Sequence, residues 1–502
     1  MGSVFVGIDV GTSAVKVLAV DEKGRTVAET TAPLQLSMPQ PGWAEQDPEA
    51  WWLATCDCLR RLVASGLDAS SIGALGLSGQ MHSSVFLDAS ENVIRPALLW
   101  CDTRTTRQCR TVTELLGEQN LKAWVQNPML EGFTLPKLLW LRDNEPEAFA
   151  RCAKVVMPKD YVRLQLTSLL ATEPSDASGT LMYDSVRGRF SPNLLDAVDL
   201  NKSLLPDLLP SQAVAGGVTA EAARLTGLLQ GTPVVAGGAD NACGALGVGV
   251  IDAGEAVASW GTSGTVLAPV AAPHVDPGLR VHTFCHVVPG SWYLMGVVLS
   301  AGAAWEWFKR ELVRDLHPSV ADARLNEEAA SVEPGSAGLS FLPYLQGERT
   351  PHRDAAARGS FVGVTLAHTR AHMSRAVLEG ICFALCDSLD ILRELAPPIR
   401  SLLVTGGGAK SAFVRQLQAD VYNAPLVCVH QEQGPALGAA LLASVGAGAY
   451  EDVPSACRSM VERRPGEQPD PGTRAKYSQA QRRFRELYLG TAPAKLGPPP
   501  KA

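Results

Sequence analysis

One short pattern, an apolar strand followed by Gly-Thr-Ser and a second apolar strand, occurs twice in this chain. The first copy is VFVGIDVGTSAVKVLAV at residues 4–20, and the second is EAVASWGTSGTVLAPV at residues 255–270. Apolar runs on both sides of a small polar turn are typical of a β-hairpin. Two copies about half a chain apart indicate weak internal symmetry and predict two lobes of related design.

The length of 502 residues also indicates more than one core, because a single core rarely grows beyond about 250–300 residues. The first hairpin continues into a third strand at GRTVAET, and Asp47 and Gly66 then suit the two ends of a helix. SIGALGLSGQMH follows as a buried strand that leads into a loop. Three strands, a helix and another strand favour an α/β domain with a mixed sheet.

Composition excludes several classes of protein. The net charge of −7 gives no electrostatic reason to expect a nucleic acid or an anionic membrane as partner. The eleven cysteines are scattered and odd in number, which argues against a secreted disulfide framework, and we interpret Cys56 and Cys58 as packing residues. No N-terminal stretch joins a basic region to an apolar segment, so we expect a cytoplasmic protein.

Glycine-rich turns after strands suit phosphate binding, because backbone N–H groups can point inward where no side chain blocks the approach. The turns do not fit the Walker pattern, and no G-x-G-x-x-G opens a helix near the N-terminus. Either hairpin alone is more often plain structure, but two hairpins and the turn Gly406–Gly408 together favour a polyphosphate ligand. Asp9, at the first bend, then sits where it could hold the magnesium of a nucleotide through water.

Phosphoryl transfer to an alcohol needs a carboxylate that accepts the hydroxyl proton, and Asp240 is the best candidate by position. It ends a predicted strand, follows two glycines that leave room for a ligand, and precedes Asn241. The alternative is that Asp240 only caps the following helix.

A polyol ligand needs neutral donors and acceptors with apolar backing. Gln80-Met81-His82 and the stretch that holds Trp100, Asp102 and Arg104 each follow a strand. His82 taken alone is more often a structural residue than a ligand contact.

Together these motifs resemble the FGGY family of carbohydrate kinases, within the actin-like ATPase superfamily, over nearly the whole chain. Two stretches, GFTLPKLLWLRDN and GSFVGVTLAHTRAHMSRAVLE, fit the family's two characteristic regions in the right order. LGLSGQMH, PKDYVRL, SDASGT, VVAGGADN, HTFCH and FLPYLQGERTPH look most like the branch that acts on D-xylulose. The resemblance implies two actin-like (ribonuclease H-like) lobes with an ATP and sugar cleft between them. It divides the chain into an N-terminal lobe, 1–247, a C-terminal nucleotide-binding lobe, 248–490, and a flexible tail, 491–502.

The activity implied is ATP-dependent phosphorylation of D-xylulose to D-xylulose 5-phosphate. By resemblance, Asp240 is the general base and Asp9 supports Mg²⁺ and activity. The residues expected at the sugar are Met81, His82, Asp102 and Asn241. Those expected at ATP are Gly11, Thr12, Ser13, Lys16, Gly261, Thr262, Ser263, Gly407 and Gly408; for Lys16 a solvated hairpin lysine is the alternative.

The chain departs from the family at Cys101, where the family usually has Asn. Cys is a weak hydrogen-bonding group, so the preferred sugar stays open between D-xylulose and another pentulose or polyol such as ribulose. A non-catalytic actin-like protein that switches on ATP is a more distant alternative, and a homodimer is an open hypothesis. The polar stretch from Gly472 onward is expected to fray, and nothing in the sequence assigns a role to Glu348, Arg349 or His352.

Overall fold

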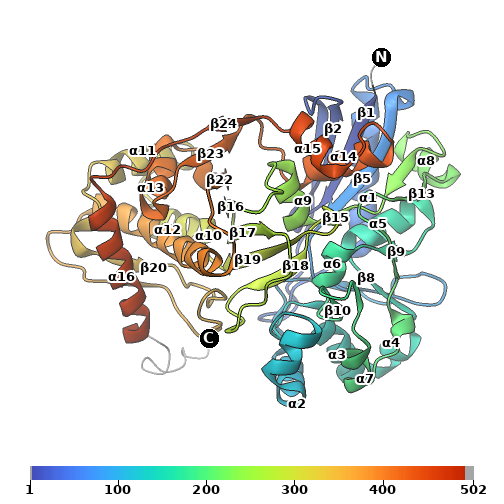
Figure 1. Ribbon diagram of the computed structural model, residues 1–502, viewed down its shortest axis with the longest axis horizontal. Coiled ribbons are helices and arrows are strands. Elements are labelled where there is room, and N and C mark those ends of the chain that lie inside the picture. The colour runs from blue at the N-terminus through green and yellow to red at the C-terminus, as the bar shows by residue number, and fades with distance from the viewer. Residues whose placement is uncertain (1–2, 492–502) are drawn as a thin grey trace.

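The computed structural model describes residues 3–491. These residues form two large mixed β-sheets with helices packed around them (Figure 1). The first sheet has, in spatial order, β13 (Val214–Gly217), β14 (Pro233–Val235), β5 (Ile72–Gly79), β1 (Val4–Val10), β2 (Ala14–Asp21) and β3 (Thr26–Pro33), and β15 (Gly238–Ala239) pairs with β5. The second has β18 (His282–Cys285), β19 (Trp292–Val298), β17 (Gly264–Val270), β16 (Glu255–Trp260), β22 (Ser401–Gly406), β23 (Leu426–Val429) and β24 (Arg463–Pro465).

The two sheets share one pattern of strand pairing, although β18 intervenes between β17 and β19 in the second. In the first, β1 is antiparallel to β2, β2 is antiparallel to β3, and β1 is parallel to β5. In the second, β16 is antiparallel to β17, β17 is antiparallel to β19, and β16 is parallel to β22. Both Gly-Thr-Ser turns join the first two strands of this unit, which confirms the predicted two-lobed, actin-like α/β fold.

Helices surround the sheets. They are α1 (Pro48–Ala64), α2 (Thr106–Trp124), α3 (Thr134–Asn144), α4 (Pro146–Arg151), α5 (Pro158–Thr167), α6 (Pro174–Ser178), α7 (Pro192–Ala197), α8 (Ala220–Thr226), α9 (Asp240–Gly247), α10 (Gly302–Leu312), α11 (Pro318–Ala330), α12 (Arg370–Leu395), α13 (Ala412–Tyr422), α14 (Pro435–Gly446), α15 (Val453–Met460) and α16 (Arg474–Thr491). Short two-stranded pairings are formed by β4 (Glu45–Gln46) with β7 (Ala97–Leu98), β6 (Val85–Leu87) with β8 (Lys154–Val156), β9 (Ala171–Thr172) with β12 (Asp207–Leu208), β10 (Tyr183–Asp184) with β11 (Arg189–Phe190), and β20 (Ser340–Leu342) with β21 (Ser360–Val362).

Strand alternation gives the two faces of the first sheet different neighbours. Val6 and Ile8 of β1 join a core cluster with Trp51 of α1 and with residues of α5. Phe5 points to the other face and joins a second cluster with residues of α9 and α14. Because side chains alternate along a strand, Gly7 and Asp9 lie on this second face as well. Asp9 therefore faces the side on which α9 begins.

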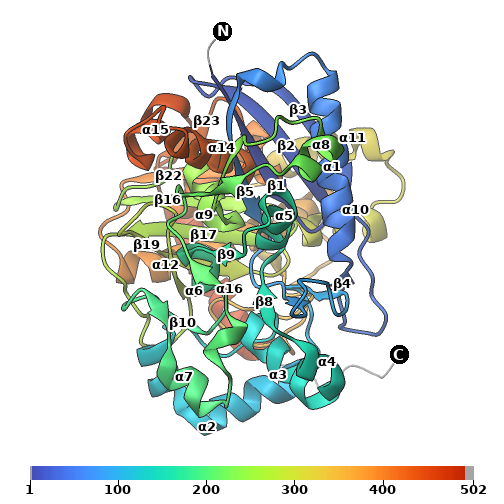
Figure 2. The same cartoon turned by 90° about the vertical axis from the view of Figure 1, so that its right-hand side faces the viewer.

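Helix α14 packs on the first sheet although it lies late in the chain (Figures 1 and 2, α14 beside β1 and β5). Glycines make this approach possible, since a Cβ built on Gly7 would lie 1.8 Å from the carbonyl oxygen of Ala436. A Cβ built on Gly76 of β5 would lie 2.0 Å from the carbonyl oxygen of Ala439. The helix backbone thus packs directly on the strand backbone.

The lobes share one continuous apolar core. The cluster that holds Phe5 and the α14 residues also holds Leu267 of β17 and both Tyr293 and Met295 of β19. All eleven cysteines are free, and Cys56 and Cys58 are buried, as predicted. Within residues 3–491, no helix is long and apolar enough to cross a membrane.

The expectation that the chain frays from Gly472 onward is wrong for most of that stretch. Residues 474–491 form α16, in which Tyr477 and Phe484 are buried in the core of the second lobe. These two aromatic residues are seven positions apart and so lie on one side of the helix, while most of the other side chains are polar or exposed. The remainder of the predicted tail, residues 492–502, lies outside the described residues.

The packing of α14 gives a stability prediction. Gly76→Ala should lower the free energy of unfolding by about 3 kcal/mol, because the new methyl group meets backbone that cannot move aside. Gly244→Ala in α9 is the matched control, since its Cβ would meet only Pro435 Cγ at 3.8 Å, and we expect a neutral or slightly stabilising effect. Equal urea midpoints for the two variants would contradict the proposed packing.

Candidate active site

The first hairpin places an acid and a lysine side by side. Asp9 of β1 pairs in register with Lys16 of β2, and parallel to Ser78 of β5. Oδ1 of Asp9 is buried and has no hydrogen-bond partner among residues 3–491. Burial raises the pKa of Asp9 to about 6, and the charge of Lys16 opposes that rise. A half-buried carboxylate with an unused oxygen fits a water-mediated Mg²⁺ site.

The turn of this hairpin is held from several sides. The Gly11 N–H donates to the carbonyl of Ala14 at 3.1 Å, which closes the turn. The Thr12 hydroxyl donates to Gln80 Oε1 at 3.2 Å and accepts from Trp100 Nε1 at 2.9 Å. Ser13 is exposed at the tip. The turn therefore has a fixed base and a free tip.

Asp240 is the first residue of α9 and directly follows β15. Its Oδ1 accepts from the backbone N–H of Asn241 at 2.7 Å and from Asn241 Nδ2 at 2.9 Å. Burial, reinforced by the negative charge of Asp9, raises the pKa of Asp240 to about 7. A carboxylate that titrates near neutral pH is well matched to accept a proton from an alcohol during group transfer.

Met81 and His82 adjoin this acid. Asn241 Nδ2 lies 3.6 Å from Met81 Sδ, and the Tyr293 hydroxyl lies 3.7 Å from the same sulfur. His82 Nδ1 is 2.7 Å from the carbonyl oxygen of Gly179, which can only accept, so Nδ1 carries the proton and Nε2 is an acceptor. Burial lowers the pKa of His82 to about 3, which keeps the ring neutral. The structure thus brings Met81, His82, Asp240 and Asn241 together.

Asp102 has a different environment from the one that the sequence suggested. It is fully buried, and its two oxygens accept from Arg104 Nε at 2.9 and 3.0 Å. Oδ2 also accepts from Arg104 Nη2 and from the Ala44 N–H, both at 2.7 Å. Arg104 in turn stacks on Trp43 at 3.6 Å. Asp102 is therefore engaged in an internal ion pair, while Cys101 beside it is half-buried.

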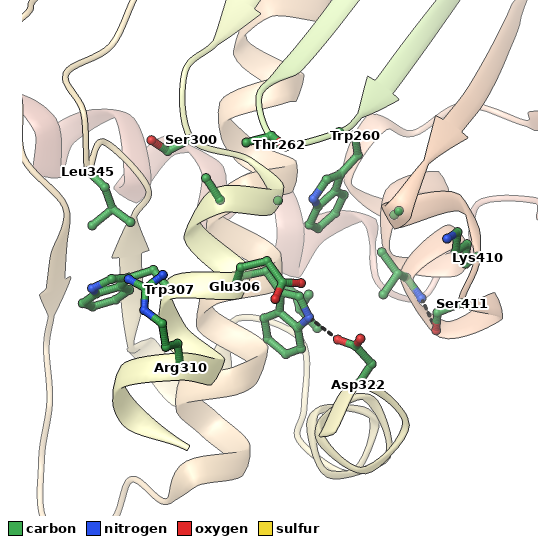
Figure 3. Close-up of a pocket in the computed structure, with 18 of the residues that line it drawn as sticks. Trp260, Thr262, Ser300, Glu306, Trp307, Arg310, Asp322, Leu345, Lys410 and Ser411 are labelled. Atoms are coloured by element: carbon green, nitrogen blue, oxygen red, sulfur yellow. Dashed lines mark hydrogen bonds between the residues drawn. The ribbon is translucent and has the colours of Figure 1, made fainter. Parts of the chain in front are cut away.

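A cavity of about 930 Å³ opens in the second lobe (Figure 3). Its lining includes Gly261 and Thr262 of the second hairpin and Gly407 and Gly408 of the glycine turn, but not Ser263. The predicted residues of the first hairpin (Gly11, Thr12, Ser13 and Lys16), together with Asp9 and Asp240, are absent from this lining. The predicted site residues therefore fall into two groups, one around Asp240 and one around the cavity.

The cavity also has walls that the sequence did not reveal. Trp260, Trp305 and Trp307 contribute aromatic surface, and Trp305 Nε1 donates to Asp322 at 2.7 Å (dashed in Figure 3). Two buried polar atoms in the lining, Ser300 Oγ and Asn326 Oδ1, have no hydrogen-bond partner in the part of the chain that the structure describes. Aromatic faces with a few unsatisfied polar atoms suit a planar, polar ligand such as a nucleobase. Trp305 and Trp307 belong to an amphipathic helix, a pattern that sequence alone interprets as core.

Comparison with known proteins identifies the family. The N-terminal domain of the FGGY family of carbohydrate kinases matches residues 4–247, and the C-terminal domain of that family matches residues 256–447. The chain belongs to the FGGY family of carbohydrate kinases. It is therefore a sugar kinase, and membership in this family implies that ATP is its co-substrate.

Several relatives match over nearly the whole chain. A xylulose kinase of Bacillus subtilis (strain 168) is 40% identical over 487 residues, which cover 97% of this chain and 97% of the relative. The crystal structure of a xyloylose kinase from Brucella ovis has a TM-score of 0.89 at 37% identity and covers 97% of this chain and 99% of its own. The crystal structure of a gluconate kinase from Lactobacillus acidophilus has a TM-score of 0.92 at 28% identity. The match covers 99% of this chain and 100% of the gluconate kinase chain.

The glycine turn at the cavity gives a matched pair of variants. In Gly408→Ala the new Cβ would lie 2.4 Å from the ring of Trp260, so this ring, which lines the cavity, must shift. We expect ADP to bind about 10-fold more weakly, as measured by calorimetry. Gly407→Ala is the control, since its Cβ would meet only Trp260 O at 3.7 Å. If both variants bind ADP as the native protein does, the nucleotide does not use this cavity.

Proposed function

We propose that this chain transfers the γ-phosphoryl group of ATP to D-xylulose, giving D-xylulose 5-phosphate. The observation that carries the proposal is the junction at Asn241, whose side-chain nitrogen contacts both Asp240 Oδ1 and Met81 Sδ. A titratable carboxylate is thereby held next to the neutral, largely apolar wall of Met81 and His82. The 40% identity to a xylulose kinase over nearly the full length supports D-xylulose as the sugar.

Asp240 acts as the general base in this proposal. Both bonds from Asn241 fix the orientation of the carboxylate, and its pKa near 7 allows it to accept the proton of the attacking hydroxyl at neutral pH. His82 offers Nε2 as a neutral acceptor for another hydroxyl of the sugar. Positioning of this kind supplies most of the rate in phosphoryl transfer.

The second-lobe cavity takes the adenosine in this proposal, with Asn326 Oδ1 and Ser300 Oγ as hydrogen-bonding groups. The phosphates extend toward the hairpins Gly11–Ser13 and Gly261–Ser263 and the turn Gly407–Gly408, where backbone N–H groups bind anions. Lys16 supplies a positive charge beside Asp9. Mg²⁺ neutralises polyphosphate charge when bound, and Asp9 is the residue that would hold it, through its unpartnered Oδ1. We assign the reaction to the cytoplasm.

A different sugar is the competing proposal. Two observations favour it: the similarity to a gluconate kinase, and Cys101 where the family usually has Asn. Both bear on which sugar binds, and neither alters the role proposed for Asp240. Membership in a family of carbohydrate kinases argues against a switch protein without catalysis.

A substrate panel tests the choice of sugar. ADP release with Mg-ATP should show the highest kcat/KM for D-xylulose among D-xylulose, L-xylulose, D-ribulose, L-ribulose, glycerol and gluconate. A clear preference for another member of the panel would overturn D-xylulose while leaving the sugar kinase in place. ADP release that no sugar stimulates would overturn both.

Asp240→Asn tests the base. We expect turnover to fall about 1,000-fold, because Asn cannot accept the hydroxyl proton, while ADP affinity stays the same. Asp252→Asn, which neutralises an exposed carboxylate outside the site, should leave turnover unchanged. Substantial turnover in Asp240→Asn would remove this residue from the role of base.

The raised pKa of Asp240 predicts the pH dependence. Protonation predominates below the pKa, so kcat/KM for the sugar should fall as the pH drops below about 7. An ordinary aspartate would remain ionised down to about pH 4. A profile that stays flat to pH 5 would contradict the assignment.

A further inference from the structure

The segment Gly347–Asp354, which holds the GERTPH motif, is fastened to the second lobe. Glu348 and Asp354 exchange backbone hydrogen bonds at 2.9 and 2.8 Å. The buried Glu348 accepts from the Leu299 N–H at 3.0 Å through Oε1. Thr350 donates its N–H to Val297 O at 3.0 Å, and its hydroxyl accepts from the Val297 N–H at 3.1 Å. The segment is therefore a rigid extension of the end of β19.

Arg349 projects from this segment toward the first lobe. Its guanidinium lies 5.9 Å from the ring of Phe133, and that ring packs at a tilt against His82, with the ring centroids 4.1 Å apart. Its positive charge contributes to the lowered pKa of both His82 and His282. Within residues 3–491 the guanidinium takes part in no hydrogen bond and no ion pair. The five N–H donors of the guanidinium thus lack an acceptor among residues 3–491, close to the Phe133 ring that packs on His82.

The acceptors that face Arg349 are also incomplete. His282 Nδ1 lies 3.1 Å from Asn127 Oδ1, which already accepts from the Thr283 N–H at 3.2 Å. Nδ1 therefore donates, and the buried Nε2 of His282 is an acceptor for which the described residues offer no donor. Within the described residues, His82 makes its one side-chain hydrogen bond through Nδ1, so its Nε2 is also free to accept. The rings of His82, Phe133, His282 and Phe284 form one aromatic cluster, with centroids 4.1 to 6.3 Å apart.

A sugar hydroxyl matches this arrangement, because it donates one hydrogen bond and accepts others. It would donate to an imidazole Nε2 and accept from the guanidinium, so that each unsatisfied group gains its partner. An anionic protein group is the other possible partner of Arg349. The acids whose charges act on its guanidinium are Glu348, its neighbour in the chain, and Glu131 of the first lobe. Glu348 Oε1 already accepts from two backbone N–H groups, so Glu131 is the acid that the variants test.

We propose that Arg349 and His282 form the second lobe's part of the sugar site, where they bind the oxygens at the end of the sugar remote from Asp240. This inference rests on the proposed function. It gives the GERTPH motif a role: Glu348 and Thr350 hold the segment in place, and Arg349 makes the contact.

Arg349→Gln tests the proposal in the full-length enzyme. We expect the KM for D-xylulose to rise about 10- to 100-fold, as for the loss of a charge-assisted hydrogen bond, with a much smaller change in kcat. Arg349→Lys should recover part of the loss because it keeps the charge. The KM for ATP should stay the same, which also shows that the second lobe is folded. An unchanged KM for the sugar would overturn the proposal.

Two matched variants separate the alternatives. Arg353→Gln removes a cation from the same segment, one that pairs with Glu118 at 3.2 Å, and should leave the sugar KM unchanged. Glu131→Gln should also leave it unchanged. If Glu131→Gln instead reproduces the effect of Arg349→Gln, Arg349 pairs with Glu131 and does not bind the sugar, which overturns the proposal.

Failure of the proposed function has a different result. If the native enzyme does not phosphorylate D-xylulose, the variants are measured with the sugar of the panel that it does phosphorylate. An unaltered KM for that sugar in Arg349→Gln overturns the role of Arg349 independently of the identity of the sugar.

Discussion

Direct contact between backbones is the constraint on which the active site depends. Gly7 and Gly76 allow α14 to lie on β1 and β5, and Gly438 allows α9 to lie on α14, since a Cβ there would be 2.0 Å from Cys243 O. Helix α9 begins at Asp240, so its distance from the sheet sets the position of that carboxylate relative to Asp9 on β1. Larger side chains at these glycines would separate the two acids. The geometry of the base is therefore determined by residues that never touch a substrate.

The closeness of the two acids has an electrostatic consequence. Each is partly removed from water, and the charge of Asp9 adds to the effect of burial on Asp240. The positive charge of Lys16 opposes the effect of burial on Asp9, whose pKa is raised to about 6. Asp240 therefore retains a share of its proton at neutral pH. The raised pKa of Asp240 thus suits it to accept a proton beside the acid Asp9.

Sequence predicted the parts of this structure that have strong local patterns. Both hairpins, the strand before Asp240 and the capped helix after Asp47 follow from alternation, turn residues and capping. The helix at residues 474–491 was missed because its two buried aromatic residues stand among polar ones, and only the second lobe shows what they pack against. The ion pair of Asp102 with Arg104 and the unpartnered state of Arg349 depend on which segments meet in space, which no local pattern contains. The roles of the site residues stay predictions for the same reason.

The second sheet carries groups from both halves of the site. Its hairpin β16–β17 presents Thr262 to the cavity, and β19, which pairs with β17 from Gly264 to Val270, brings Tyr293 to Met81. Strand β18 adds His282 and Phe284 to the aromatic cluster around His82. A displacement of this sheet on nucleotide binding would therefore also move the wall next to Met81 and His82. Because coupling between two binding sites is reciprocal, sugar binding would shift the same sheet and alter the affinity for nucleotide by the same factor.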